Sequence, residues 1–525
     1  MPSVTQLVTS LDKPLDPVAI FQRLAPLGRR VWLDSSAGEP ETEKADKQAT
    51  EVGLNLNPHA RYSFLTADPI LELVAHVDDP DPWPALSQLA ARLPDSRLTP
   101  RCLVEADGSC SGEDSLPPFQ GGLVGIIGYE ASRWIEPQEL ATCHLNQQDD
   151  LPTPAMSFGV FDWTIAIDHF THRAWLICQG WDRDMFAGDL ADAPPTLSTE
   201  QLAQNASERR DQILALLNDE WCEAATPDSQ ANETGETYTV PITSNFAEGE
   251  FCEAVEQIVA GIRNGDSFQV NLAQRLTAPE NVLPEQLYLS LRQANPAPQS
   301  GFYDGGSFHV LSSSPEGFLQ IRDSHVSTRP IKGTRPRTGD EAVDRRYGEE
   351  LLASEKDRAE NIMIVDLMRN DLSQVCTDES VRVSQLCQLE RYECVQHLVS
   401  VVEGDLRPES SIVDCLRACF PGGSITGAPK IEAMKIIARL EPNPRGPYCG
   451  SMGYISCSGQ ADFNILIRTI TATGGQLQIP VGGGITARSE PAAEEAETWA
   501  KAEGMLRSLG PYSIIKRQLS ESGGA

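Results

Sequence analysis

The run Thr328-Arg329-Pro330-Ile331-Lys332-Gly333-Thr334-Arg335-Pro336 places one lysine between a proline and a Gly-Thr pair. A lysine in an apolar or backbone-lined site is costly to keep charged, so it tends to lose its proton and act as a nucleophile or base. Sixteen residues upstream, Glu316 offers a carboxyl group that could be the matching acid. The alternative is a surface lysine in a basic loop, because arginines at 329, 335 and 337 flank it.

The charge balance narrows the classes of partner. The chain has 525 residues, a formal net charge of −33 and a pI near 4.6. Phosphate backbones and anionic membranes require basic surfaces, so we expect neither a nucleic-acid nor a membrane partner. The segment Met1–Leu15 lacks the pattern of a signal peptide, and no run approaches the length of a membrane span. We therefore expect a soluble cytoplasmic protein.

The cysteines and histidines show no metal-binding spacing. The thirteen cysteines include no Cys-x-x-Cys pair, and the eight histidines form no cluster. This usage predicts free thiols in a reducing compartment rather than disulfides or a zinc site.

The distribution of strands, helices and linkers predicts an α+β protein with antiparallel sheets, because regular βα alternation is missing. Short strands are expected at 31–33, 61–65, 70–74 and 158–167, and the glycine-rich 121–129 is expected to form closely packed strands. Helices are expected at 200–217 and 246–264. We predict four regions, namely an N-terminal region (1–220), a polar acidic linker (221–240), a catalytic domain (241–515) and a flexible tail (516–525).

Two acidic pairs have helical spacing. Asp357 and Glu360 are three residues apart, and Glu494 and Glu497 repeat that spacing near the C-terminus. Two helices that each present such a pair could hold a hard divalent cation through oxygen ligands, which suits Mg²⁺. The alternative for either pair is a solvated helix face in an acidic chain.

Glycine-rich segments could bind anions. Residues Phe420–Lys430 open a helix, and Val481–Thr486 follow an apolar strand. Backbone amides in such turns can bind carboxylates, and Arg468 could clamp one in bidentate fashion. The alternative is that each glycine segment is only a turn.

Taken in order, these segments resemble the chorismate-utilising enzymes over nearly the whole chain. The N-terminal Pro118–Gly122 and Tyr129 resemble the amination branch of that family, which contains the anthranilate synthase and aminodeoxychorismate synthase component I proteins. The resemblance implies an anthranilate synthase component I-like fold, with large antiparallel β-sheets flanked by helices and two intertwined subdomains. The markers are Gly265–Leu272, Ser314-Pro315-Glu316, Pro330–Thr334, Ser354–Asp371, Pro421–Lys430, Arg468, and the pair Glu494 and Glu497.

Three positions distinguish the branches. Relatives that add water carry a basic lysine where this chain has Gln269, and a neutral amide is a poor base. Anthranilate synthases typically have alanine at Lys332, and Pro421–Gly427 resembles the aminodeoxychorismate version. The resemblance thus implies amination of chorismate at C4 for 4-aminobenzoate and folate synthesis. The alternatives are anthranilate synthase component I and a catalytically silent regulator that binds chorismate or tryptophan.

The resemblance also assigns roles to single residues. Lys332 would attack C2 of chorismate and form a covalent intermediate, while Glu316 protonates the departing C4 hydroxyl. His397 would lie near that hydroxyl, although a core histidine fits its sequence context equally. The residues implied to hold chorismate are Gly333, Thr334, Tyr448, Arg468, Gly482, Gly483, Gly484 and Lys501. Those implied to hold Mg²⁺ are Glu360 and Glu497, assisted by Asp357 and Glu494.

Two further expectations concern other ligands and partners. A possible tryptophan pocket in the N-terminal region matches Ser35, Pro296, Ala297 and Pro298. The chain lacks the cysteine elbow of a glutaminase, Cys449 being the nearest candidate, so a separate glutamine amidotransferase subunit is implied as the ammonia donor. Departures from the family pattern are modest, with Gly483 where relatives often have alanine and Phe268 where many have tyrosine.

Overall fold

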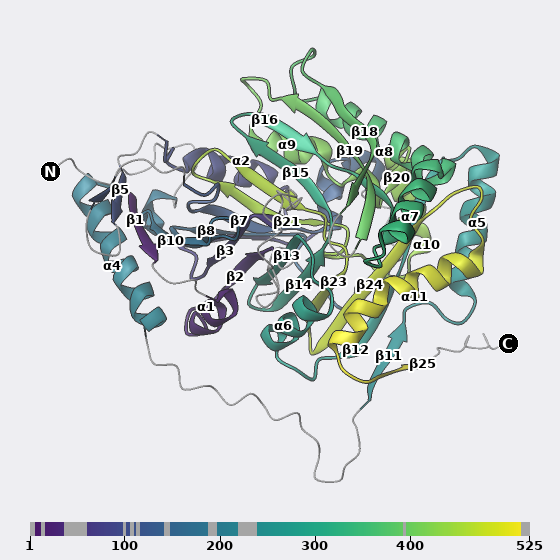
Figure 1. The fold of residues 1–525 in the computed structure, drawn as a ribbon, viewed down its shortest axis with the longest axis horizontal. Coiled ribbons are helices and arrows are strands. Elements are labelled where there is room, and N and C mark those ends of the chain that lie inside the picture. Colours follow the sequence, from purple (N-terminus) through teal and green to yellow (C-terminus); the bar gives the residue numbers. More distant parts are fainter. Residues whose placement is uncertain are drawn as a thin grey trace, which may run out of the picture.

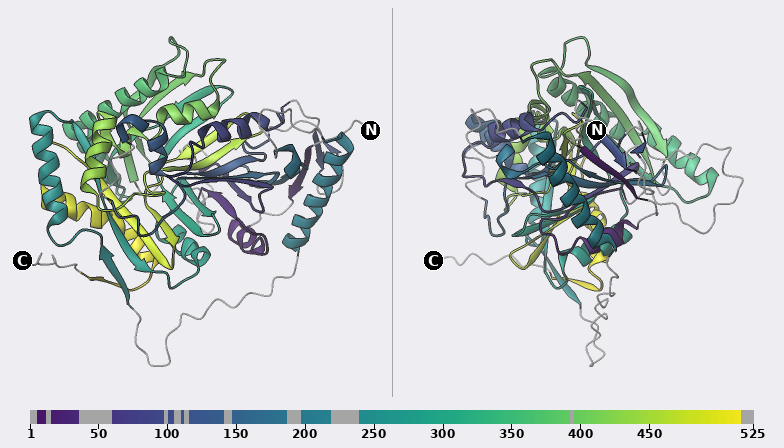
Figure 2. Two further views of the ribbon diagram at one scale, coloured as in Figure 1. Left: turned by 180° about the vertical axis from the view of Figure 1, so that it is seen from behind. Right: turned by 90° about the vertical axis from the view of Figure 1, so that its left-hand side faces the viewer.

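Two β-sheets with helices on their outer faces make up the molecule (Figure 1). The computed structural model describes residues 6–11, 16–35, 60–97, 101–104, 110–111, 116–140, 147–186, 197–218, 239–391 and 395–515. The predicted tail and residues 221–238 of the predicted linker lie outside these ranges. In the views of Figure 2, strands from early and late in the chain lie side by side, as the strand order requires.

The larger sheet contains fifteen strands within the described residues. Neighbours are antiparallel except for two parallel pairs, β1 with β5 and β11 with β25. Its strands in spatial order are β25 (Tyr512–Ile515), β11 (Val240–Ser244), β12 (Gln269–Pro279), β24 (Gln476–Ile485), β23 (Thr469–Thr473), β14 (Phe308–Ser314), β13 (Gln299–Asp304), β2 (Val31–Asp34), β3 (Tyr62–Thr66), β9 (Trp163–Asp168), β10 (Arg173–Cys178), β1 (Gln6–Leu11), β5 (Arg101–Val104) and β6 (Cys110–Ser111), with β20 (Gly427–Ala428) beside β12.

The smaller sheet contains ten strands among the described residues, and its neighbours pair antiparallel. In spatial order they are β17 (Ile331–Pro336), β19 (Val395–Asp405), β16 (His325–Thr328), β15 (Gly317–Arg322), β22 (Ala461–Asn464), β21 (Ser451–Ser456), β7 (Gly122–Ile127), β8 (Met156–Phe161) and β4 (Leu71–Ala75), with β18 (Arg382–Arg391) also beside β19.

Helices cover both sheets, and α8 begins where the Ser354 hydroxyl accepts a hydrogen bond from the Asp357 amide at 3.3 Å, a typical N-cap. The buried side of α8, which includes Ile364 and Met368, packs into the main hydrophobic core. The helices are α1 (Pro17–Arg23), α2 (Trp83–Arg92), η3 (Tyr129–Trp134), α3 (Pro137–Leu140), η4 (Arg183–Met185), α4 (Thr199–Asn218), α5 (Glu250–Asn264), α6 (Pro284–Ala294), α7 (Glu341–Ala353), α8 (Glu355–Ser373), α9 (Ile412–Cys419), η5 (Gly423–Ile425), α10 (Lys430–Leu440) and α11 (Pro491–Ser508).

The predicted α+β class with intertwined subdomains is confirmed. Each sheet combines strands from both sides of residues 219–238, since β7 pairs with β21 and β2 pairs with β13. The expected helices at 200–217 and 246–264 appear as α4 and α5. The two main hydrophobic clusters therefore each contain apolar residues from both halves of the chain.

Close strand packing at 121–129 is also confirmed. A Cβ on Gly125 would lie 2.2 Å from the carbonyl oxygen of Ser157 on the neighbouring β8, so only glycine fits there. The expectation for Val481–Thr486 was wrong in one respect, because most of this segment continues β24 instead of turning after it. Its glycines pair in register with β12, Gly484 opposite Asn271 and Gly482 opposite Ala273, and this pairing extends the strand.

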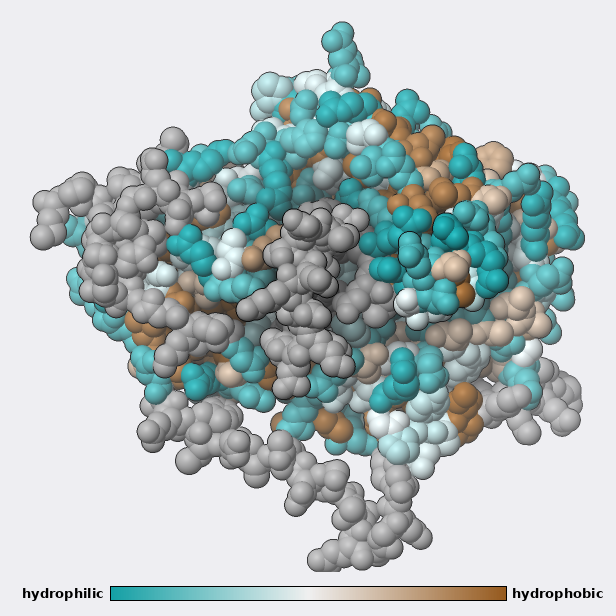
Figure 3. Space-filling model, viewed as in Figure 1, coloured by the Kyte–Doolittle hydropathy of each residue, from teal (hydrophilic) through white to brown (hydrophobic). Residues whose placement is uncertain are grey.

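The face shown in Figure 3 is largely hydrophilic, in keeping with the acidic composition. Among the helices that the structure describes, none combines the length and apolar character needed to cross a bilayer.

Candidate active site

Lys332 lies on β17 immediately before a β-bulge. The register of β17 on β19 shifts between Lys332, opposite Leu398, and Thr334, opposite His397. The intervening Gly333 has a φ of +75°, and an added Cβ would lie 2.9 Å from Cγ of Asp357. Such a bulge changes the direction of the neighbouring side chains, so glycine is required at this position for the local geometry.

Lys332 and Glu316 meet at one residue, Ser424. The lysine Nζ donates a hydrogen bond to the Ser424 carbonyl at 3.1 Å, and the Ser424 hydroxyl and the Ile331 amide hydrogen-bond to the Glu316 carboxylate. Burial raises the pKa of Glu316, and the nearby Lys332 opposes this rise. A carboxyl group that keeps its proton more readily than usual suits a general acid. The bridging role of Ser424 was not predicted, although its motif was recognised.

The arginines near Lys332 in sequence have other partners. Arg329 pairs with Glu390 at 2.5 Å, and Arg337 pairs with Asp344 at 3.4 Å. Arg335 approaches Asp357 at 4.0 Å. The groups that interact electrostatically with Lys332 include the carboxylates of Glu316, Glu360 and Glu497. The lysine therefore belongs to an acidic site and not to a basic loop.

His397 lies beside Thr334 and is buried. Its Nδ1 lies 2.9 Å from the Thr334 hydroxyl, and the ring also forms a hydrogen bond with the backbone of Gly333. Burial, together with the positive charge of Arg468, lowers the pKa of His397 to about 4. The imidazole is therefore neutral at pH 7, and burial also lowers the pKa of the Arg468 guanidinium. The structure brings these predicted residues together with Lys332.

The two predicted acidic pairs face the same site from α8 and α11. Burial raises the pKa of Glu360, and the nearby negative charges of Asp357 and Glu494 act in the same direction. Oε1 of Glu360 is buried without a hydrogen-bond partner. Oε2 of Glu494 and Oε1 of Glu497 both lie near the position of a Cβ on Gly483, at 3.6 and 3.9 Å. Carboxylates on neighbouring elements are thus adjacent and mutually repulsive.

The chemistry of these side chains fits Mg²⁺, because this ion prefers hard oxygen ligands. The buried Glu360 oxygen without a hydrogen-bond partner is such a ligand. Glu497 forms an ion pair with Lys501 at 2.8 Å, and the Glu494 carboxylate accepts a hydrogen bond from the Ser489 hydroxyl at 2.6 Å. Within the described parts of the chain, no three His, Cys, Asp or Glu side chains converge closely enough to enclose an ion.

The glycines of β24 form the remaining wall of the site. Lys501 Nζ donates to the Gly482 carbonyl at 2.9 Å, which places the lysine over this strand. A Cβ on Gly484 would lie 2.1 Å from Nε2 of Gln269, and the Gln269 Oε1 is buried without a partner. The neutral amide that distinguishes the branches therefore lies against the predicted substrate-binding glycines.

Tyr448 is buried, as is Gly483, whereas the other predicted substrate-binding residues are at least partly exposed. Tyr448 is 4% exposed, and the Arg445 guanidinium is 5.9 Å from its ring. The adjacent Cys449 thiol interacts electrostatically with Glu316, which places this segment behind the acid. Tyr448 therefore borders the site at its buried end.

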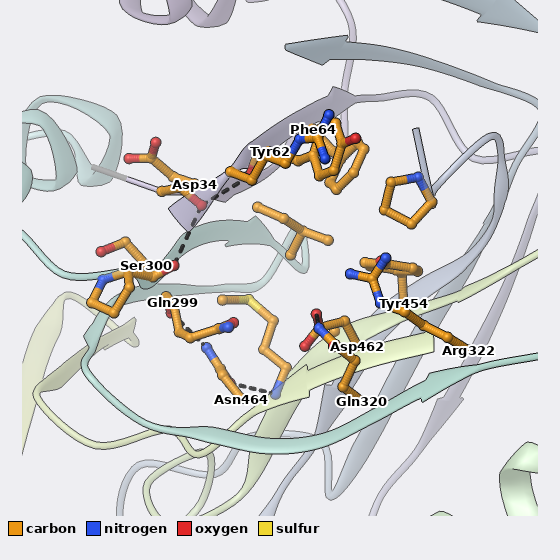
Figure 4. Close-up of a pocket in the computed structure, with 17 residues that line it drawn as sticks. Asp34, Tyr62, Phe64, Gln299, Ser300, Gln320, Arg322, Tyr454, Asp462 and Asn464 are labelled. Atoms are coloured by element: carbon orange, nitrogen blue, oxygen red, sulfur yellow. Dashed lines mark hydrogen bonds between the residues drawn. The ribbon is translucent and has the colours of Figure 1, made fainter. Parts of the chain in front are cut away.

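A separate pocket, partly open to solvent, lies between the two sheets. Figure 4 shows Asp34 and Tyr62 from the larger sheet opposite Asp462 and Tyr454 from the smaller. Burial raises the pKa of Asp462 to about 6, although its side chain borders the cavity and is partly accessible, and Gln320 donates to it at 2.6 Å.

Two of the four residues predicted for a tryptophan pocket line this cavity. They are Ser35 and Pro298, and the Ser35 hydroxyl donates to the Tyr62 carbonyl at 2.8 Å. Ala297 is buried beside them, and its carbonyl accepts from Ser300 at 2.9 Å, whereas Pro296 is exposed.

The chain is similar to several known proteins. A family model described as chorismate binding enzyme matches residues 44–507. The chain is 38% identical over 459 residues to aminodeoxychorismate synthase component 1 of Salmonella typhimurium, covering 86% of this chain and 91% of that protein. It is 39% identical over 401 residues to anthranilate synthase component 1 of Streptomyces coelicolor, covering 75% and 74%.

Among solved structures, anthranilate synthase component I from Streptococcus pneumoniae superposes with a TM-score of 0.67 at 28% identity. The match covers 94% of this chain and 98% of that one. These similarities extend over most of its length, and the chain belongs to the chorismate-binding enzyme family.

Proposed function

We propose that the chain aminates chorismate at C4 and forms 4-amino-4-deoxychorismate, the activity for which its aminodeoxychorismate synthase relatives are named. The observation that carries this proposal is the arrangement of Lys332 and Glu316 on the two sides of Ser424. A lysine amine beside a buried carboxylic acid is the pair that nucleophilic displacement of a hydroxyl requires.

The reaction proceeds in two displacements. The lone pair of the Lys332 amine attacks C2, both ring double bonds shift by one position, and the C4–O bond breaks as Glu316 donates its proton, so water leaves. Ammonia then attacks C4, both double bonds return to their original positions, and the C2–N bond breaks to release the lysine. The Glu316 carboxylate takes the surplus proton from the new amine. Protons and leaving groups therefore balance over one turnover, and the acid is regenerated.

Substrate carboxylates are held by positive and neutral donors around this pair. We assign the enolpyruvyl carboxylate to Arg468, Thr334 and the backbone of Gly482–Gly484, with Tyr448 at the buried end. Glu360 and Glu497, with Asp357 and Glu494 beside them, would hold Mg²⁺. When bound, this ion supplies positive charge that offsets the ring carboxylate. His397, neutral at pH 7, lies beside Thr334 and orients its hydroxyl.

We assign the supply of ammonia to a separate glutamine amidotransferase subunit in the cytoplasm. The cysteine with the nearest sequence context, Cys449, is buried, and burial raises its pKa to about 12, so it cannot serve as a thiolate nucleophile. The structure shows free thiols at Cys178, Cys252, Cys376, Cys387, Cys415, Cys419, Cys449 and Cys457.

The cavity between the sheets is proposed to bind tryptophan. Arg61 and Arg322 supply positive charge for a carboxylate, Asp462 supplies negative charge for an ammonium group, and Tyr62 and Tyr454 supply aromatic surface. Titration of the purified chain with tryptophan by calorimetry tests this assignment, with phenylalanine and glutamate as controls.

The reaction is tested with purified chain, chorismate, ammonium chloride and Mg²⁺. We expect chorismate to be consumed without fluorescence and 4-aminobenzoate to appear only after aminodeoxychorismate lyase is added. Fluorescent anthranilate and pyruvate formed without the lyase would contradict C4 amination and identify an anthranilate synthase. A complete lack of turnover would instead favour a silent regulator.

A further inference from the structure

Ser424 contacts Lys332 and Glu316, the two residues that act as nucleophile and acid in the proposed reaction. Its carbonyl accepts from Lys332 Nζ at 3.1 Å, and its hydroxyl bonds to the carboxylate of Glu316. The residue is 8% exposed, so its neighbours restrain it on all sides. The position of Ser424 therefore sets how the nucleophile and the acid are oriented relative to each other.

Residues 420–429, here called the Ser424 loop, are closed at their base by Lys430. The Nζ of this lysine donates to the Cys419 carbonyl at 3.1 Å and to Oδ2 of Asp371 at 2.7 Å. Both partners of the ion pair are buried, with side chains 14% and 5% exposed. Because Asp371 belongs to α8, the pair joins the loop to the helix that carries the first acidic pair.

A contribution to stability does not by itself explain this ion pair. Breaking a buried pair is costly, but replacing it with packed apolar groups is often neutral or stabilising. Lys430 is also the first residue of α10, where the helix dipole disfavours a positive charge. A lysine in this place therefore indicates a requirement for a fixed geometry.

Other contacts hold the far side of the loop. Arg445 donates to the Ile425 carbonyl at 3.0 Å, and the Asn271 amide donates to the Thr426 carbonyl at 2.8 Å. These contacts join the loop to β12 and to the segment before β21. The loop also packs directly on α8, because Gly423 lies against Leu367, and Lys430 adds an ion pair to that contact.

We propose that the Asp371–Lys430 ion pair is a positioning unit for catalysis. It fixes the position of the Ser424 loop relative to α8. Lys332 and Glu316 are thereby held in a defined position relative to the acidic residues of that helix when the substrate binds. Neither Asp371 nor Lys430 touches the substrate. This inference rests on the proposed roles of Lys332 and Glu316.

The test compares Lys430→Met and Asp371→Asn with the matched control Lys435→Met. Lys435 lies on the same helix and forms a partly exposed pair with Glu139. We expect kcat for chorismate consumption to fall about 10- to 100-fold in the two ion-pair variants, because a shift of about 1 Å in a reacting group costs that much. KM for chorismate should stay within about 2-fold, and the control should match the wild type.

A pH profile distinguishes positioning from simple stabilisation. Ser424→Ala removes a hydrogen bond that stabilises the ionised carboxylate of Glu316, so the pKa of Glu316 should rise. The limb of the pH profile in which kcat falls with rising pH should therefore move to higher pH. Lys430→Met should move the same limb in the same direction. The combined Lys430→Met/Ser424→Ala variant should lose little more than the worse single variant, since both act through one residue.

The result that overturns the proposal is a lower Tm with kcat per folded molecule and the pH limb unchanged. Fully additive losses in the combined variant would also overturn it. If the single variants do not fold, Asp371→Asn/Lys430→Met leaves no buried charge and provides the same readout. The assay measures consumption of chorismate, so the identity of the product, which decides the proposed function, is scored separately.

Discussion

At the scale of single residues, Lys332 offers the most direct chemical test. Lys332→Ala should lose most C4 amination and shift towards anthranilate, because alanine leaves C2 open to ammonia as in the sister enzymes. Incubating the wild type with chorismate without ammonia should leave an adduct on the peptide that contains Lys332, visible by mass spectrometry. An unchanged rate of 4-amino-4-deoxychorismate formation in the alanine variant would mean that ammonia attacks directly.

The acidic residues make a second prediction at this scale. Glu360→Gln or Glu497→Gln should abolish turnover with little loss of fold, because each change removes an anionic oxygen at nearly constant volume. Asp366→Asn is the matched control, since Asp366 lies on α8 but is 80% exposed. Turnover is measured across a magnesium titration, and near-normal rates at limiting magnesium in both glutamine variants would make the pairs ordinary helix faces.

His397 should make stability depend on pH. The pKa of this imidazole is about 4 in the folded chain and 6.5 in the unfolded chain, so between these values the unfolded chain binds more protons. The free energy of unfolding should therefore fall as pH decreases from 6.5 to 4, by up to about 3 kcal/mol from this group. Urea titrations at several pH values should show a flatter profile for His397→Gln but not for His76→Gln.

At the scale of elements, the pairing of β12 with β24 brings glycine backbone to the site. A Cβ on Gly482 would lie 2.6 Å from the Leu272 carbonyl and 3.0 Å from the Ala273 Cα, so the strands would have to separate. Gly482→Ala should reduce the free energy of unfolding by about 1–3 kcal/mol. Gly483→Ala is the control, since its nearest atom is the flexible Lys501 Nζ at 3.4 Å, and equal urea midpoints for the two variants would contradict this account.

At the scale of the whole molecule, the cavity between the sheets links ligand binding to stability. The folded pKa of Asp462 is about 6 and its unfolded value is 3.8, so ionising this carboxyl group opposes folding as pH rises through that range. Asp462→Asn should therefore raise the free energy of unfolding at pH 7 by roughly 1–3 kcal/mol. The same variant should bind tryptophan more weakly in calorimetry, and unchanged affinity would remove Asp462 from the ligand's contacts.

The sequence by itself determined the family and the fold class, and it supplied the candidate site residues. Lys332, Glu316 and the two acidic pairs became candidates through their side-chain chemistry, and the resemblance to the family supplied their proposed roles. Helices such as α8 were predictable, since capping and periodicity act over a few residues.

Only the tertiary structure decided which of these groups meet. It paired the nearby arginines with other carboxylates, continued β24 through Gly482–Gly484, and placed Ser424 between Lys332 and Glu316. It also created the cavity between the sheets from segments hundreds of residues apart. Strand register and burial are set by long-range packing that no local pattern specifies, and these two factors fix which charged groups are neighbours.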